Sequence, residues 1–246
     1  MKTVYLAASA LLVAGTVAAS AADLPAKVYT KAAPPVAAFD PWDVAFGAGI
    51  TNNYVFRGVS QTQGDPAISG GLDAGYGMFY AGVWASNVDF GVPDPKVEID
   101  AYVGVKPTVG DTSFDFGVLY YGYRKDKNGA PGSNSYTEVK AAVSRAFGPA
   151  TLGAAVYYSP EWPGQGGDAT YFEGNAAIPL SKYFTLSGAV GHQEIKNYGD
   201  YNTWNIGVGF LLGENATIDV RYHDTDEHSY GKIYDSRLAV SLKAAF

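Results

Sequence analysis

The sequence predicts an all-β protein: an antiparallel transmembrane β-barrel of 12 strands with up-and-down topology, formed by residues 42–246. Three observations predict this fold. Apolar and polar residues alternate with a period of two through most of this range, as in strands with one apolar and one polar face. The connections alternate between long and short, as in outer-membrane barrels. The chain ends on Phe246, inside an amphipathic segment, and pairing of the last strand with the first would leave no free edge.

Residues 1–21 are predicted to be a secretory signal peptide that is cleaved on export. Lys2 gives a positive start, residues 6–17 form an apolar stretch, and the small residues 19–21 suit a cleavage site. A short membrane anchor is the alternative interpretation of this stretch. Residues 22–41 are rich in Pro and Ala without periodicity, which predicts a flexible periplasmic segment before the barrel.

The first half of the barrel domain contains six segments of alternating polarity. In one of them, Val97 and Ile99 alternate with Glu98, so that apolar and charged residues fall on opposite faces of a strand. The segments have roughly the 9–12 residues that a tilted strand needs to cross a bilayer. They lie near residues 42–57, 66–75, 78–87, 96–106, 112–123 and 135–146.

The second half repeats the pattern in six further segments. The last one places Leu238, Val240 and Leu242 on one face. We expect these three residues, together with Phe246, to form the signal by which the barrel assembly machinery recognises the closing strand. The other five segments are centred on residues 152–156, 172–178, 184–190, 204–210 and 218–222.

The connections between these segments fall into two classes. Long connections are expected on the extracellular side and short turns on the periplasmic side. The long ones lie at residues 57–66, 86–95, 124–135, 159–168, 193–200 and 223–234. The short ones lie at residues 76–77, 108–111, 147–150, 179–182 and 212–215.

Composition excludes several classes of protein. The chain has 24 acidic and 17 basic residues and a net charge of −7, which argues against nucleic-acid binding because that requires a basic surface. It contains no cysteine, so we expect neither disulfides nor thiolate metal sites. After the N-terminus, no apolar run approaches the roughly 20 residues of a membrane helix.

The sequence offers little for catalysis. There are three histidines, His192, His223 and His228, and no GxSxG motif. Residues 223–228 (HDTDEH) are the one concentration of groups that could bind a divalent metal or polarise a water molecule. A hydrated polar loop is the simpler interpretation. We therefore expect no catalytic residue, no metal and no cofactor.

Charged residues on the polar faces are predicted to line the lumen. Their number favours a water-filled interior, because charges are costly to bury without water. The alternative is a plug, in which the same charges pair across the lumen. Acids of the fourth, sixth and eighth segments are expected to oppose Arg221 and Arg237, which would give a mild preference for cations. The candidate pore-lining charges are Glu98, Asp100, Asp115, Glu138, Lys140, Glu173, Asp219, Arg221 and Arg237.

Four stretches of the barrel domain read NNYVFRGVSQTQGDPAISGG at 52–71, FYAGVWASNVDFG at 79–91, EIDAYVGV at 98–105 and YTEVKAAVS at 136–144. They resemble the TorF-type porins, a group of Gram-negative outer-membrane proteins. The resemblance covers nearly the whole barrel domain, and its block at 57–66 is fairly specific. It implies an outer-membrane location and a barrel, and it offers no catalytic residues to transfer.

The sequence therefore predicts a porin of the Gram-negative outer membrane, exported through its signal peptide. Its function would be the passive diffusion of small hydrophilic solutes or ions. The expected partners are outer-membrane lipid and lipopolysaccharide, the barrel assembly machinery and the solutes themselves. A non-conducting structural or surface-interaction barrel is the alternative, and an outer-membrane enzyme is not expected.

Overall fold

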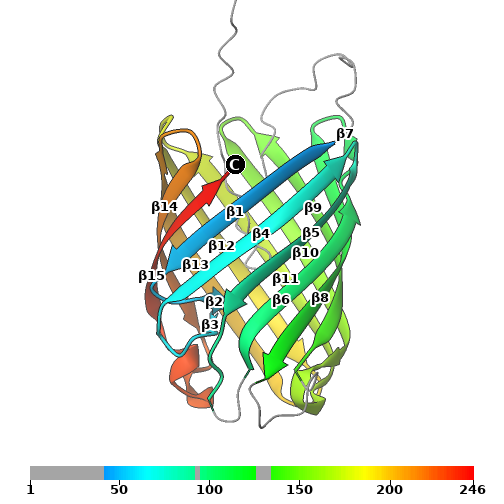
Figure 1. Cartoon of the computed structure of the whole chain (residues 1–246), viewed down its shortest axis with the longest axis vertical. Coiled ribbons are helices and arrows are strands. Elements are labelled where there is room, and N and C mark those ends of the chain that lie inside the picture. The colour runs from blue at the N-terminus through cyan, green and yellow to red at the C-terminus, as the bar shows by residue number, and fades with distance from the viewer. Residues whose placement is uncertain (1–41, 92–94, 126–133) are drawn as a thin grey trace, which may run out of the picture.

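The computed structural model describes residues 42–91, 95–125 and 134–246. The predicted signal peptide (1–21) and periplasmic segment (22–41) lie outside the described residues. Over the described ranges the chain forms a closed barrel of 12 antiparallel strands (Figure 1), which confirms the predicted fold class. No helix in these ranges is long and apolar enough to cross a membrane.

The barrel strands follow one another around the wall in chain order. They are β1 (Asp43–Thr51), β4 (Ala67–Tyr76), β5 (Phe79–Asn87), β6 (Pro95–Val105), β8 (Thr112–Lys125), β9 (Tyr136–Phe147), β10 (Ala150–Trp162), β11 (Gly167–Pro179), β12 (Phe184–Ile195), β13 (Gly199–Leu212), β14 (Ala216–Thr225) and β15 (Arg237–Ala245). The shorter elements are β2 (Val55–Phe56), β3 (Val59–Ser60), β7 (Thr108–Val109), η1 (Pro163–Gln165), η2 (His228–Tyr230) and η3 (Lys232–Tyr234).

The barrel closes where β1 pairs with β15, as the amphipathic C-terminus predicts. The last residue takes part in this closure. The amide of Phe246 donates to the carbonyl of Phe46 at 2.9 Å, and the amide of Phe46 donates back to the carbonyl of Phe246 at 3.0 Å. The two rings stack with centroids 5.2 Å apart. Because the chain end is paired along its length, it exposes no free strand edge.

The strands present apolar side chains outward and polar or small ones inward. In β1, Val44, Phe46 and Ile50 are exposed on the outer surface, whereas Gly47 is buried on the inner side. The C-terminal strand does the same, with Leu238, Val240 and Leu242 outward. Such a continuous exposed apolar surface is typical of a protein that a bilayer surrounds.

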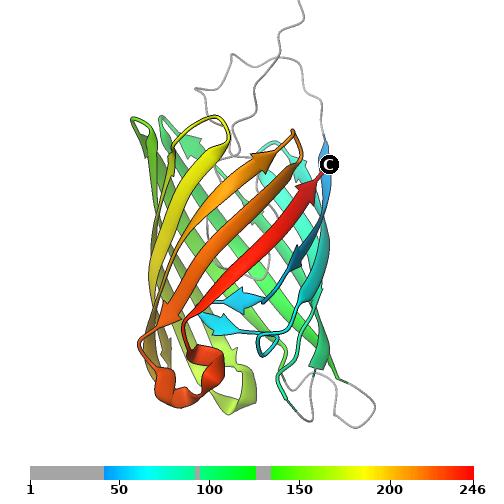
Figure 2. The same cartoon turned by 90° about the vertical axis from the view of Figure 1, so that its left-hand side faces the viewer.

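The two ends of the barrel differ. One end carries short turns, such as the one at Gly148, whose φ of 59° is a conformation that glycine adopts without strain. The C-terminus lies at this short-turn end (Figures 1 and 2). The other end carries the longer connections, including residues 52–66 and 226–236. We call the two ends of the lumen the short-turn half and the long-loop half.

Two predicted loops are largely strand. Residues 159–168 and 193–200 were expected to be long connections, but β10 extends to Trp162 and β12 to Ile195, and the link between β12 and β13 is only residues 196–198. Glu194 still pairs with Asp200 in this extension. Polarity in these stretches reports exposure to water and not the end of a strand, because a hairpin can continue beyond the bilayer with polar side chains.

The first predicted strand was too long. It was expected to reach residue 57, but β1 ends at Thr51 and the chain then leaves the barrel wall. Residues 52–66, here called the inserted segment, turn into the lumen, where β2 and β3 form a small separate hairpin (Figure 2). This segment defines the candidate site.

Candidate functional site in the barrel lumen

The tip of the inserted segment is a tight turn at Arg57 and Gly58. Both residues have positive φ, 46° and 80°, as a two-residue turn between β2 and β3 requires. Glycine adopts this conformation freely, but for arginine the left-handed region costs on the order of 1–2 kcal/mol. Such local strain persists only where surrounding contacts stabilise it, and it is concentrated at functional sites.

Gly58 lies against the barrel wall. A Cβ atom added here would lie 2.4 Å from the Thr203 Oγ1 of β13 and 2.6 Å from the Thr225 Cγ2 of β14. Both threonines are buried. The turn therefore requires glycine at position 58 for two reasons, its backbone conformation and its close approach to the wall.

Hydrogen bonds within the inserted segment hold it together. The Ser60 hydroxyl donates to Asn53 Oδ1 at 2.7 Å, and the Thr62 hydroxyl donates to the Asp65 carbonyl at 2.6 Å. The backbone amide of Tyr54 donates to Thr62 Oγ1 at 3.2 Å. These bonds pair several polar groups of the segment within the segment itself, which favours its entry into the barrel as one ordered unit.

The Arg57 side chain anchors the inserted segment to the barrel wall. Its guanidinium donates to both carboxylate oxygens of Glu138 at 2.8 Å and to Gln193 Oε1 at 3.0 Å. The same group lies over the rings of Tyr171 and Tyr157, at 4.3 and 5.0 Å from their centroids. Glu138 was predicted to line the pore. In the structure it is buried beneath the inserted segment.

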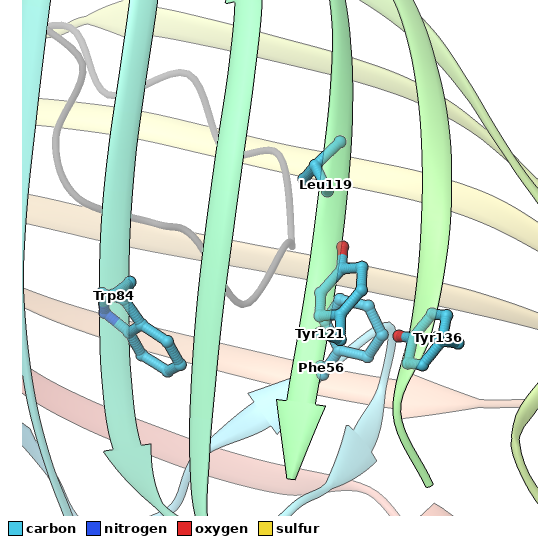
Figure 3. Packing of buried hydrophobic residues seen from close by; sticks show 5 residues of the cluster. All are labelled: Phe56, Trp84, Leu119, Tyr121 and Tyr136. Atoms are coloured by element: carbon cyan, nitrogen blue, oxygen red, sulfur yellow. The ribbon is translucent and has the colours of Figure 1, made fainter. Parts of the chain in front are cut away.

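Aromatic side chains fill the space around this ion pair. Phe56 of the inserted segment belongs to a cluster with four buried residues of the wall (Figure 3), and its ring centroid lies 6.0 Å from that of Tyr121. The rings of Tyr121 and Tyr136 stack at 4.4 Å, and the Tyr121 hydroxyl donates to Glu138 at 3.0 Å. The four wall residues are Trp84, Leu119, Tyr121 and Tyr136. The long-loop half of the lumen is thus packed and dry at this level.

Two further acids lie in the packed half. Glu98 and Asp100 on β6 are 1% and 2% exposed. Tyr123 donates to one oxygen of Glu98 at 3.1 Å. The other Glu98 oxygen and both Asp100 oxygens have no hydrogen-bond partner in the described part of the chain. Asp100 pairs in register with Trp84 and Tyr121 on the neighbouring strands, so aromatic residues flank it on the inner face.

The short-turn half has a different character. Asp115 accepts from the Lys140 ammonium at 2.8 Å and from the Tyr80 hydroxyl at 2.7 Å. Tyr102 donates to Asp73 at 2.6 Å. These residues are only partly buried. This half is therefore polar and accessible to water.

The remaining candidate charges bind local partners. Arg221 forms a two-pronged contact with Asp219 at 2.9 and 3.0 Å, and Glu173 accepts from the Asn175 amide at 3.0 Å. Arg237 donates to the backbone carbonyl of Lys232 at 3.0 Å. Arg221 and Arg237 therefore do not face the acids of the opposite wall as free charges.

The histidine-rich stretch 223–228 is divided by the fold. His223 faces inward from β14 and is buried, whereas His228 lies beyond the strand, with its Nε2 2.9 Å from Asp224. This hydrogen bond raises the pKa of His228 above its usual value. Across the ranges described, no group of three or more His, Cys, Asp or Glu side chains is arranged to hold a metal.

Sequence reasoning placed most of these charges on the inner face, but it missed the inserted segment. Gln193, Tyr157 and Tyr171, which contact Arg57, were not among the candidates. The one available signal was the Arg57-Gly58 pair between short apolar runs, since glycine in such a place indicates a tight turn.

Comparison with known proteins identifies the family. Residues 36–246 match the model of the Gcw_chp family, described as bacterial proteins of unknown function. The chain belongs to this family. The match does not carry the TorF-type name, which stays a prediction. A search of curated proteins gives no match.

Solved structures with a similar barrel include porins. The KdgM porin in complex with disordered oligogalacturonate superposes with a TM-score of 0.56 at 9% identity, covering 82% of this chain and 98% of that chain. The NanC porin gives a TM-score of 0.52 at 12% identity, again covering 82% and 98%. At such low identities the likeness shows a shared fold.

Proposed function

We propose that the protein is a channel of the Gram-negative outer membrane through which small hydrophilic solutes or ions diffuse passively. The apolar outer surface suits contact with lipid and lipopolysaccharide, and the closing strand β15 suits recognition by the barrel assembly machinery. The proposal includes no catalytic activity and no cofactor. The fold shared with the KdgM and NanC porins supports it.

One observation carries the proposal: the water-accessible, ionisable interior of the short-turn half. Lys106, Asp115 and Lys140 lie inside the barrel and remain partly exposed. A barrel with a purely structural role could fill this space with apolar side chains, as small barrels do. The long-loop half is closed by the inserted segment, which is not part of the wall. Movement of this segment would therefore open the passage in the proposed channel.

Planar-bilayer recording of the refolded protein tests the proposal. We expect small or rare current steps from the wild-type protein and steps at least several-fold larger when residues 55–60 are replaced by six Gly and Ser residues. Gln63→Ser, which alters an exposed residue of the same segment, is the control and should behave like wild type. Both variants should retain the heat-modifiable migration of a folded barrel.

The packed long-loop half favours a second candidate, a non-conducting structural or surface-interaction barrel. Arg57, Glu138 and the surrounding rings exclude water as a plug would. The same recordings separate the two functions. If the 55–60 replacement folds and inserts but passes no current, the channel proposal is wrong and the structural barrel replaces it.

A further inference from the structure

The Arg57 side chain lies in its site as a ligand would. Every group that contacts its charged end, apart from the ring of Phe56, belongs to the barrel wall. Four neighbouring strands contribute these residues. They are Glu138 of β9, Tyr157 and Trp162 of β10, Tyr171 of β11 and Gln193 of β12.

These wall residues match the chemistry of a guanidinium group. Glu138 offers two oxygens to the two parallel N–H groups of the fork, at 2.8 Å each, which is the geometry that distinguishes guanidinium from ammonium. Gln193 adds an amide oxygen at 3.0 Å. The guanidinium carbon lies over the rings of Tyr171 and Tyr157, 4.3 and 5.0 Å from their centroids, where aromatic rings stabilise cations.

Support for Glu138 comes from the wall and not from the inserted segment. Tyr121 donates to its Oε2 at 3.0 Å, so that the carboxylate stays oriented when Arg57 is absent. Gln193 is likewise fixed, because its amide nitrogen donates to the carbonyls of Thr170 and Glu194, both at 3.2 Å. Glu138 and Gln193 would therefore keep their positions if the Arg57 side chain left the site.

We propose that the lumen contains a binding site for solutes that carry a guanidinium group, and that Arg57 occupies it as a tethered competitor. The inference rests on the proposed channel function in naming the class of solute that passes. A solute that displaces Arg57 also removes the contact that holds the inserted segment in the lumen, so binding and opening are coupled.

Isothermal titration in detergent tests the site without requiring conduction. Arg57→Ala should bind methylguanidinium saturably, and adding Glu138→Gln should weaken that binding at least tenfold. Urea, which is planar but neutral, should not bind. Wild type should bind more weakly than Arg57→Ala, because a tethered group competes at an effective concentration in the millimolar range. Equal ionic strength is maintained with NaCl.

Two outcomes would overturn the site: no binding to folded Arg57→Ala, or binding that Glu138→Gln leaves unchanged. If Arg57→Ala does not fold by itself, its folded yield becomes the measurement. Millimolar methylguanidinium should then raise the folded yield of Arg57→Ala above the yield with NaCl. An unchanged yield also contradicts the proposal. Binding without any bilayer current would reject the channel but retain the site, and current without binding would do the reverse.

Discussion

Two ion pairs on the inner face of the same barrel show how different its halves are. Glu138 meets Arg57 at 2.8 Å with side chains 2% and 1% exposed, and Asp115 meets Lys140 at the same distance with side chains 17% and 16% exposed. The distances alone would rank the pairs as equal. Their surroundings make them unequal, because water screens the charges in the short-turn half and is excluded from the long-loop half.

The difference arises from what fills the lumen. A barrel of 12 strands is wider than the small barrels that their own side chains fill. In the short-turn half, wall residues such as Tyr80 and Tyr102 stay partly exposed. In the long-loop half, the inserted segment adds Phe56 and Arg57 to the wall residues, which closes the space. Moving one segment should therefore make the two halves alike.

The largest effect is expected from Gly58→Ala. The new methyl group would meet Thr203 Oγ1 at 2.4 Å, and we expect it to drive the turn off the wall and raise single-channel conductance several-fold. Gly64→Ala is the matched control, because Gly64 also has positive φ, 94°, but a methyl group there meets nothing within 4 Å. Bilayer recordings in which both variants match wild type would show that the inserted segment does not close the lumen.

Removing one carboxylate from each pair measures the difference between the halves directly. Glu138→Gln leaves the guanidinium buried without its counter-charge, which should cost on the order of 3 kcal/mol of unfolding free energy. Asp115→Asn breaks a partly hydrated pair and should cost less than about 1 kcal/mol. Urea unfolding in lipid vesicles gives both values. Equal losses would mean that the two halves are equally accessible to water.

The fold could be predicted because alternation with a period of two is set by the wall itself. Val44 and Phe46 must face lipid whatever fills the lumen, so the alternation of apolar and polar residues identifies the wall strands. The inserted segment leaves no such pattern. Val55 and Phe56 repeat the apolar character of β1 although the chain has already left the wall after Thr51, and the left-handed turn at Arg57 and Gly58 follows them.

The pairing of charges could not be predicted, because register fixes which residues are neighbours but not which long side chains meet. Asp219 and Arg221 lie two residues apart on one face of β14 and bind each other. Glu138 finds its partner 81 positions away, through a loop. Composition could only state that acids outnumber bases, which holds equally for a hydrated pore and for a plug.

Asp100→Asn is expected to change the unfolding free energy less than Glu138→Gln does, and in the opposite direction. A buried carboxylate without hydrogen bonds destabilises the packed half, so replacing it with a neutral amide should raise the unfolding free energy by about 1 kcal/mol. Asp73→Asn in the short-turn half is the comparison and should lower stability slightly, because Asp73 accepts from Tyr102. A loss of stability in Asp100→Asn would show that this carboxylate has a partner in the folded protein.

The smallest effect is expected from a pair outside both halves. His228 contacts Asp224 at 2.9 Å with its side chain 53% exposed, and this hydrogen bond raises the pKa of His228. The folded protein then holds the proton more tightly than the unfolded chain. The resulting stabilisation is present below the unfolded pKa of about 6.5 and is lost as pH rises through the folded pKa.

Melting temperatures between pH 6 and pH 8 should therefore fall slightly in wild type, and the fall should be smaller in His228→Asn. Asp224→Asn should remove the same pH-dependent component, and the double variant should lose no more than either single one, since one contact is responsible. A change as large as that from Glu138→Gln would contradict the ranking of pairs by exposure, because an exposed pair is screened by water and a buried one is not.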